Sequence, residues 1–235
     1  MRYTRAMQGL LLVDKPAGWT SFDVVNYVRR IVATAEGKKP KNCKVGHTGT
    51  LDPFATGLLV LLIGKEYTKK AGELSKLDKT YEVTMRLGQQ STTGDPEGEI
   101  TAISDTIPTV EAIREALKQF TGPIQQVPPA FSAIKVNGVR AYKLAREGKE
   151  VIIEPRQVTI NRLELVDYTY PEVKFVADVT SGTYIRTLVE DIGKTLGTGA
   201  YTTELRRTVI NNYNVTQAAP IDGLNAAMLE TVLAQ

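Results

Sequence analysis

Cysteine and histidine are nearly absent from this chain of 235 residues, which contains one of each. With only Cys43 and His47 available, the chain cannot supply a disulfide framework, a Cys/His zinc site or a two-cysteine redox pair. A Ser-His-Asp triad would have to use His47, and no G-x-S-x-G segment supplies its serine. A single thiol fits a reducing compartment, so we expect a cytoplasmic protein.

Long apolar runs are also missing. The run at 58–63 is too short to span a membrane, and the run at 10–13 is too short for the apolar region of a signal peptide. We therefore expect no membrane segment. The net charge of +3 and the isoelectric point near 8.8 are compatible with a nucleic-acid partner but are not evidence for one.

The most informative stretch of the sequence is 45–64, VGHTGTLDPFATGLLVLLIG. Its apolar end predicts a strand buried on both faces. Glycines in the loop before it allow tight turns or close approach to a ligand, and Pro53 restricts the backbone of Asp52 to extended geometry. Asp52 is therefore our candidate for a functional carboxylate at the rim of a cleft. The alternative is an ordinary Asp-Pro turn, in which the aspartate caps nearby N–H groups.

The segment GHTGTLDPFATGLL closely resembles the catalytic motif of the TruB family of tRNA pseudouridine-55 synthases. The resemblance implies that Asp52 is the essential catalytic residue. It also implies the α+β pseudouridine synthase fold, with a long, mixed, mainly antiparallel sheet flanked by helices and loops. We expect one catalytic domain over 1–235, with 122–150 as an RNA-gripping insertion. Family members usually continue into a small PUA-like RNA-binding domain, which we expect to be largely absent here.

Two further segments carry the resemblance and imply catalytic roles. The K-x-Y-x-V segment at 79–83 places Tyr81 where the family has a tyrosine that stacks on the target base and assists removal of its proton. From the residues alone, a tyrosine at an apolar strand position such as Tyr81 is more often a core residue with its hydroxyl bonded. The SGTYIR segment at 181–186 implies that Arg186 pairs with Asp52, which would keep the carboxylate ionised, and that Tyr184 packs the site.

Several residues are candidates for contact with the T-arm of tRNA. The segment 125–148, QQVPPAFSAIKVNGVRAYKLAREG, resembles the tRNA-gripping element of the family and includes Lys135 and Arg146. Basic residues interleaved with aromatic ones suit looped RNA, although an amphipathic surface element has the same composition. The resemblance adds Lys15 of the DKPAGWTS opening, His47 and Arg206 of the LRR segment. The alternative for Lys15 is that it only caps the end of a strand, and the alternative for Arg206 is plain surface charge.

The remaining elements follow from periodicity and capping signals. We expect strands at 9–13, 80–87, 158–166 and 172–180, and a loop at 167–171. Thr20 with Asp23 predicts the start of a helix, and Thr109 predicts another that ends at Gly122. The segment 65–77 reads as one helix, and a weak helix is expected at 225–233. Asn137-Gly138 predicts a hairpin turn. The lysine-rich segment 36–44 is predicted to be a loop, either a solvated surface or a phosphate contact.

The resemblance implies a reaction that isomerises uridine to pseudouridine at position 55 in the T-loop. No cofactor or metal is expected, because nothing is oxidised and no group comes from outside. Asp52 would either deprotonate the ribose 2′ carbon or attack the ribose or the base, and the target base must leave its stack. A monomer is expected. The alternatives are a pure RNA-binding module, a magnesium-dependent phosphotransferase and a paralogue within a guide-RNA particle.

Overall fold

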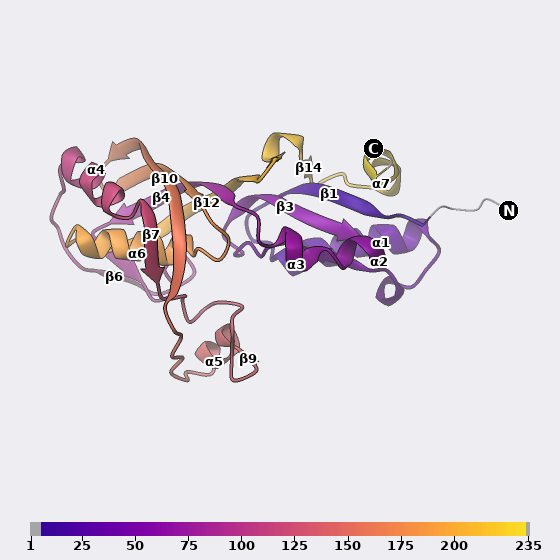
Figure 1. Ribbon diagram of the computed structural model, residues 1–235, viewed down its shortest axis with the longest axis horizontal. Coiled ribbons are helices and arrows are strands. Elements are labelled where there is room, and N and C mark those ends of the chain that lie inside the picture. The colour runs from indigo at the N-terminus through magenta and orange to yellow at the C-terminus, as the bar shows by residue number, and fades with distance from the viewer. Residues whose placement is uncertain (1–5, 234–235) are drawn as a thin grey trace. The chain divides into compact units, whose positions relative to one another are not determined.

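The computed structural model describes residues 6–233, which form two compact units. The first combines the residues up to Thr80 with those from Arg206 onward, and we call it the terminal unit. The second, Tyr81–Leu205, is the middle unit. The chain passes between them within two strands, β4 (Lys79–Leu87) and β12 (Ala200–Ile210), labelled in Figure 1.

The sheet of the terminal unit is built on β3 (Thr56–Ile63). This strand pairs antiparallel with β1 (Gly9–Lys15) from Gly9↔Ile63 to Lys15↔Gly57, and antiparallel with β2 (Val45–His47). The end of β12 pairs parallel with β3, where Arg206 and Arg207 lie opposite Thr56 and Gly57. The short β14 (Ala219–Pro220) runs parallel to β1, and β13 (Tyr213–Asn214) pairs with the end of β12. The predicted strand at 9–13 is confirmed and runs on to Lys15.

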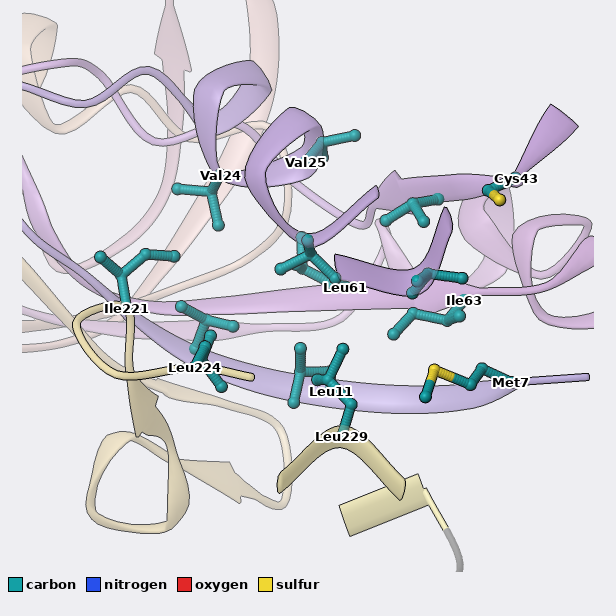
Figure 2. Packing of buried hydrophobic residues seen from close by; sticks show 14 of the residues in the cluster. Met7, Leu11, Val24, Val25, Cys43, Leu61, Ile63, Ile221, Leu224 and Leu229 are labelled. Atoms are coloured by element: carbon teal, nitrogen blue, oxygen red, sulfur yellow. The ribbon is translucent and has the colours of Figure 1, made fainter. Parts of the chain in front are cut away.

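The apolar run of β3 is buried on both faces, as its sequence predicts. Every side chain from Leu58 to Ile63 is at most 1% exposed. One set packs with α1 (Ser21–Ala35), β1 and α7 (Ala226–Leu233) in the cluster drawn in Figure 2, and the other packs with Ile210. Burial of each such side chain stabilises the fold by about 1.5–3 kcal/mol. The strand is therefore a rigid support for the loop before it.

Helix α1 begins as its sequence predicts. The Thr20 side chain accepts a hydrogen bond from the Asp23 amide, and the Asp23 carboxylate accepts one from the Thr20 amide, which completes a capping box. The predicted single helix at 65–77 is wrong. It is interrupted after Thr68, giving α2 (Lys65–Thr68) and α3 (Ala71–Leu74), because the chain turns through Lys69 and Lys70. The segment 36–44 contains a short 3₁₀ helix, Pro40–Asn42, rather than only loop, and another covers Val215–Gln217.

The sheet of the middle unit has the order β12-β4-β11-β10-β7. Strands β10 (Arg156–Thr169) and β11 (Glu172–Val179) form a long antiparallel hairpin, and β7 (Gly122–Gln126) pairs antiparallel with β10. The prediction of a loop at 167–171 is wrong in part, because β10 continues to Thr169 and leaves only a tight turn. A two-stranded ribbon, β5 (Gln89–Ser91) and β6 (Ile100–Ala102), lies outside this order.

The helices of the middle unit are α4 (Val110–Gln119), α5 (Ala141–Arg146) and α6 (Ile185–Thr195). Thr109 caps α4 by accepting a hydrogen bond from the Ala112 amide, as predicted, but the predicted end at Gly122 is wrong, because the helix ends at Gln119 and Gly122 begins β7. Asn137 and Gly138 both have positive φ and join β8 (Lys135–Val136) to β9 (Val139–Arg140), which confirms the predicted hairpin turn. In Figure 1 the segment with β9 and α5 extends away from the sheet of its unit. The mixed sheets with flanking helices confirm the α+β class.

Candidate active site

The loop between β2 and β3 carries Asp52, and hydrogen bonds fix its backbone on both sides of that residue. On the N-terminal side, the Ser21 hydroxyl accepts from the Leu51 amide at 2.8 Å and donates to the Leu51 carbonyl at 3.1 Å. Ser21 is the first residue of α1, and both it and Leu51 are buried. A buried serine that satisfies both backbone groups of one residue leaves that residue little freedom.

The C-terminal side is held through Pro53. Its carbonyl accepts from the Gly18 amide at 2.9 Å and from the Lys15 ammonium at 3.2 Å. The Ala55 amide donates to the carbonyl of Asp52 itself at 3.2 Å. Asp52 thus lies between two residues whose backbones are tied to β1 and α1, while its own side chain is only partly buried. The loop presents a carboxylate on a fixed backbone, as the Asp-Pro pair predicts.

Lys15 is fully buried, although the family resemblance suggests that it contacts the substrate. Its ammonium group also donates to the carbonyls of Pro16 at 2.9 Å and Trp19 at 2.6 Å. A buried ammonium with carbonyl acceptors joins the end of β1 to the loop around Asp52. This geometry favours a positioning role for Lys15, and direct contact with substrate stays a prediction.

Arg207 is the residue that the sequence reasoning missed. It is 1% exposed, and its guanidinium donates to the carbonyls of Leu58 at 2.8 Å, Gly49 at 3.1 Å and Thr50 at 3.4 Å. It therefore joins the start of β3 to the loop that leads to Asp52. Strand alternation could have found it, because Arg207 shares the inward face of β12 with Leu205 while Arg206 points the other way.

Gly57 allows Arg207 to come this close. Its φ is +102°, and an added Cβ atom would lie 2.3 Å from the Arg207 carbonyl oxygen and 2.8 Å from the Arg207 nitrogen. Both atoms are backbone, so no side-chain rotation could relieve the contact. Glycine at this position is a requirement of the β3–β12 pairing.

The buried charge of Arg207 changes the titration of its neighbours. The pKa of His47 is lowered, first by burial and then by Arg207, although a hydrogen bond with the Gly49 backbone opposes this. The pKa of Lys79 is lowered to about 8 by burial and by Arg207, with Asp78 opposing the shift. A neutral imidazole suits hydrogen bonding to RNA rather than phosphate attraction, and the predicted RNA contact of His47 stays a prediction.

Arg206 is engaged within the terminal unit. Its guanidinium forms a two-pronged ion pair with Asp14, at 3.1 and 2.7 Å, and lies 3.3 Å from the Thr56 hydroxyl. About a third of each charged side chain is exposed, at 37% for Arg206 and 32% for Asp14. The pair ties β12 to β1 beside the loop that carries Asp52. Contact of Arg206 with RNA stays a prediction.

The middle unit holds Arg186 in the first turn of α6. Its guanidinium donates to the carbonyls of Thr93 at 2.7 Å and Phe131 at 3.0 Å, and lies 3.3 Å from the Asp95 carboxylate. Asp95 is fixed in turn by the Thr93 hydroxyl at 2.6 Å and the Glu97 amide at 3.0 Å. Asp95 is not among the candidate residues that the sequence offers. The pairing of Arg186 with Asp52 stays a prediction.

The other candidates of the middle unit are Tyr81 on β4, Tyr184 at the N-cap of α6, Lys135 on β8 and Arg146 on α5. Tyr81 is buried on β4, on the same face as Val83 and Met85. The Tyr184 backbone is held by the Gln126 side-chain amide, which accepts from its N–H at 2.8 Å and donates to its carbonyl at 3.0 Å. Within 122–150, Lys135 and Arg146 are exposed, and the Arg146 guanidinium lies 5.6 Å from the centre of the Tyr142 ring. Stacking of Tyr81 on a base stays a prediction.

Glu190 of α6 lies close to Arg186 and to the turn that contains Gly94. Burial raises its pKa, followed in size by the opposing effect of Lys194. Gly94 leaves room for it, because an added Cβ atom there would lie 2.5 Å from a Glu190 carboxylate oxygen and 3.3 Å from Arg186. The turn at 93–95 is thus packed closely against α6 at Arg186 and Glu190.

Comparison with known proteins agrees with this geometry. The family model for the TruB family pseudouridylate synthase N-terminal domain matches residues 36–185, and that for the tRNA pseudouridylate synthase B C-terminal domain matches residues 186–234. Similar curated proteins are named tRNA pseudouridine synthase B. The one from Burkholderia mallei (strain NCTC 10247) is 46% identical over 95% of this chain and 71% of the relative. The one from Mycobacterium sp. (strain KMS) is 47% identical over 92% and 71%.

Among solved structures, a chain in the crystal structure of a Cbf5-Nop10-Gar1 complex is similar, with a TM-score of 0.68 and 27% identity. The match covers 92% of this chain and spans about half (52%) of that one. This likeness confirms the pseudouridine synthase fold expected from the motif. The prediction of one catalytic domain over 1–235 stays a prediction. With both family models and close relatives in agreement, the chain belongs to the TruB family of pseudouridylate synthases.

Proposed function

We propose that this protein isomerises uridine to pseudouridine at position 55 in the T-loop of tRNA, with Asp52 as the catalytic residue. The observation that carries the proposal is the fixed backbone around Asp52, which Ser21, Gly18 and Lys15 hold within a chain of the TruB family. A carboxylate must meet the sugar–base junction in one orientation, and a loop held at several points provides it.

The reaction breaks the bond between ribose C1′ and uracil N1 and forms a bond between C1′ and C5. The proton on C5 leaves and N1 gains one, so atoms and electrons balance without an oxidant, a reductant or a donated group. Asp52 acts either by deprotonating the ribose 2′ carbon or by attacking the ribose or the base. The target nucleotide is everted from its stack first.

In this proposal Tyr81 stacks on the uracil and helps to remove the C5 proton, while Arg186 orients the Asp52 carboxylate and keeps it ionised. The contacts of Arg186 with Asp95, Thr93 and Phe131 support such a role, because they fix the guanidinium within its unit. The hydrogen bond to the Phe131 carbonyl also links Arg186 to the segment 122–150.

RNA contact is proposed for the exposed Lys135 and Arg146 of the insertion 122–150, and also for His47, Tyr184 and Arg206. Lys15 supports the loop that carries Asp52 through its hydrogen bond to the Pro53 carbonyl. We further propose that the protein acts as a monomer in the cytoplasm. Among residues 6–233, no helix has the length and apolar character needed to cross a membrane.

The test is tritium release from tRNA transcript labelled at uridine C5, with EDTA present. Wild type is compared with Asp52→Asn and with Asp222→Asn, which removes an exposed carboxylate of the same unit. We expect wild type and Asp222→Asn to release tritium, and the rate of release by Asp52→Asn to be lower by about 10²–10⁴-fold.

Release by Asp52→Asn at the wild-type rate would refute the catalytic role of Asp52. No release by folded wild type that binds tRNA would refute the synthase activity itself. Loss of release on adding EDTA would show that a metal is required, against the metal-free reaction proposed here.

A further inference from the structure

The terminal unit contains an open pocket that none of the catalytic candidates lines. Its volume is about 730 Å³, and it lies between α1 and the segment that leads into β2. The residues that give it its chemical character come from both walls, and they are Asn26, Arg29, Arg30, Lys41, Lys44 and Val45. Both walls belong to one unit, so the pocket is a property of that unit alone.

The pocket is strongly cationic. Four of its lining residues are arginine or lysine, and none of the residues that line it within the described chain carries a carboxylate. The acidic residues nearest in sequence are already engaged. Asp23 completes the capping box of α1, and Glu36 pairs with Lys38 at 2.8 Å. Positive charge that neighbouring carboxylates do not neutralise attracts a polyanion.

One of the cations is held in place before any ligand arrives. The Arg29 guanidinium donates to the Asn26 side-chain oxygen at 2.6 Å and to the Val45 carbonyl at 3.0 Å. Its central carbon also lies 5.8 Å from the centre of the Phe22 ring. These contacts lower the entropy cost of binding, because the guanidinium is already oriented. Arg30, Lys41 and Lys44 are exposed around it.

An exposed aromatic ring extends the same surface. Phe22 is 60% exposed, and it shares one face of α1 with Asn26, Arg29 and Arg30, at spacings of four, seven and eight residues. The opposite face of the helix packs into the core through Val24, Val25, Val28 and Val32. An aromatic ring beside guanidinium and ammonium groups is the composition of surfaces that bind looped or single-stranded RNA.

The pocket is also close in the chain to the proposed active site. Lys44 and Val45 line it, and His47 ends the same strand two residues later, which is roughly 7 Å along an extended chain. The loop with Asp52 begins immediately after. A short stretch of RNA that leaves the Asp52 loop therefore has this pocket within reach.

We propose that this pocket is a second RNA-binding subsite, which holds backbone phosphates of the tRNA outside the target nucleotide. The inference rests on the proposed function, since it takes tRNA as the ligand. Arg29 provides the oriented contact, while Arg30, Lys41 and Lys44 provide charge. The subsite contributes to tRNA affinity and not to the chemical step.

The test is a triple variant, Arg30→Ala/Lys41→Ala/Lys44→Ala, which leaves Arg29 and its hydrogen bonds intact. Binding of an unmodified tRNA transcript is measured by fluorescence anisotropy over a range of salt concentrations, and pseudouridine formation is measured over a range of tRNA concentrations. We expect the slope of log K against log salt to fall by about 2, at roughly 0.7–0.9 per lost phosphate contact, with Kd raised about tenfold or more. KM should rise accordingly while kcat changes by less than about twofold.

A matched control removes the same charge elsewhere. Lys118, Lys174 and Lys194 are exposed on α4, β11 and α6, and their triple replacement by alanine should leave the salt slope near that of wild type. If both triple variants lose affinity equally, or if the pocket variant binds as wild type does, the subsite is refuted. The single variants Arg30→Gln and Lys44→Gln give the same test should the triple variant fold poorly, each with a slope change of about 0.7–0.9.

The two proposals fail in different ways. If wild type forms no pseudouridine, the proposed function is wrong, yet the salt slopes still report whether the pocket binds RNA. If wild type is active and the pocket variant keeps the wild-type slope and KM, only the subsite is wrong.

Discussion

Replacement of Gly57 by alanine tests whether the β3–β12 contact supports the loop that carries Asp52. At φ +102° an alanine is strained, which costs about 1–2 kcal/mol. Its Cβ atom would also lie 2.3 Å from the Arg207 carbonyl oxygen and within 3.0 Å of two further Arg207 backbone atoms. Relieving that overlap requires moving one strand of a buried pair, which adds about 1–3 kcal/mol. We expect a total cost of about 3 kcal/mol, a large part of the stability of an ordinary domain.

The measurement is urea unfolding followed by the fluorescence of Trp19, the only tryptophan in the chain, which is partly buried and packs against the core of the terminal unit. Gly223→Ala is the control. Gly223 lies in the same unit at φ +89°, with no atom within 4 Å of an added Cβ, so it reports backbone strain without the overlap. Gly57→Ala should cost about 2 kcal/mol more than Gly223→Ala.

The catalytic consequence follows from the position of Arg207. A shift of its backbone moves the guanidinium that holds the carbonyls of Gly49, Thr50 and Leu58, so kcat of Gly57→Ala should fall even where the protein is fully folded. Equal stability of the two alanine variants, together with an unchanged kcat, would refute the reasoning.

Two further predictions concern the charges around this loop. Arg207→Met keeps the apolar volume but removes three charge-assisted hydrogen bonds, so we expect the free energy of unfolding in urea to fall by about 3 kcal/mol and kcat to fall as well. A variant as stable as wild type would contradict the positioning role of Arg207. The pKa of Lys79 is about 8 in the folded protein, below its ordinary 10.5, so the unfolded state binds more protons between these values and stability rises with pH across that window. Relative to Lys79→Met, the free energy of unfolding of wild type should therefore rise by about 1 kcal/mol between pH 7.5 and 9.5, a figure reduced for the partial exposure of Lys79. An identical pH dependence of unfolding in the two proteins would show that the Lys79 pKa is ordinary.

Elements defined by neighbours in the chain were predictable from the sequence. The strand at 58–63 follows from an apolar run, the start of α1 from Thr20 and Asp23, and the hairpin from Asn137-Gly138. The helix predicted at 65–77 failed because its apolar pattern is weak, and the chain turns at Lys69 and Lys70 instead. The loop predicted at 167–171 is shorter than expected, because pairing with β11 extends β10 to Thr169.

The candidate site likewise has one part that the sequence predicts and another that depends on contacts between distant residues. The sequence by itself identified Asp52 as the candidate catalytic residue, since glycines, a proline and an apolar run surround it within a few residues, and the TruB motif covers the same positions. Only the tertiary structure decided what holds it. Ser21 lies 30 residues from Leu51, Arg207 lies 158 residues from Gly49, and Arg186 lies 93 residues from Thr93. These contacts are side chain to backbone, and a backbone carbonyl carries no residue signature. Strand alternation can place Arg207 on the inward face of β12, but no local pattern shows which distant backbone carbonyl such a side chain will bind.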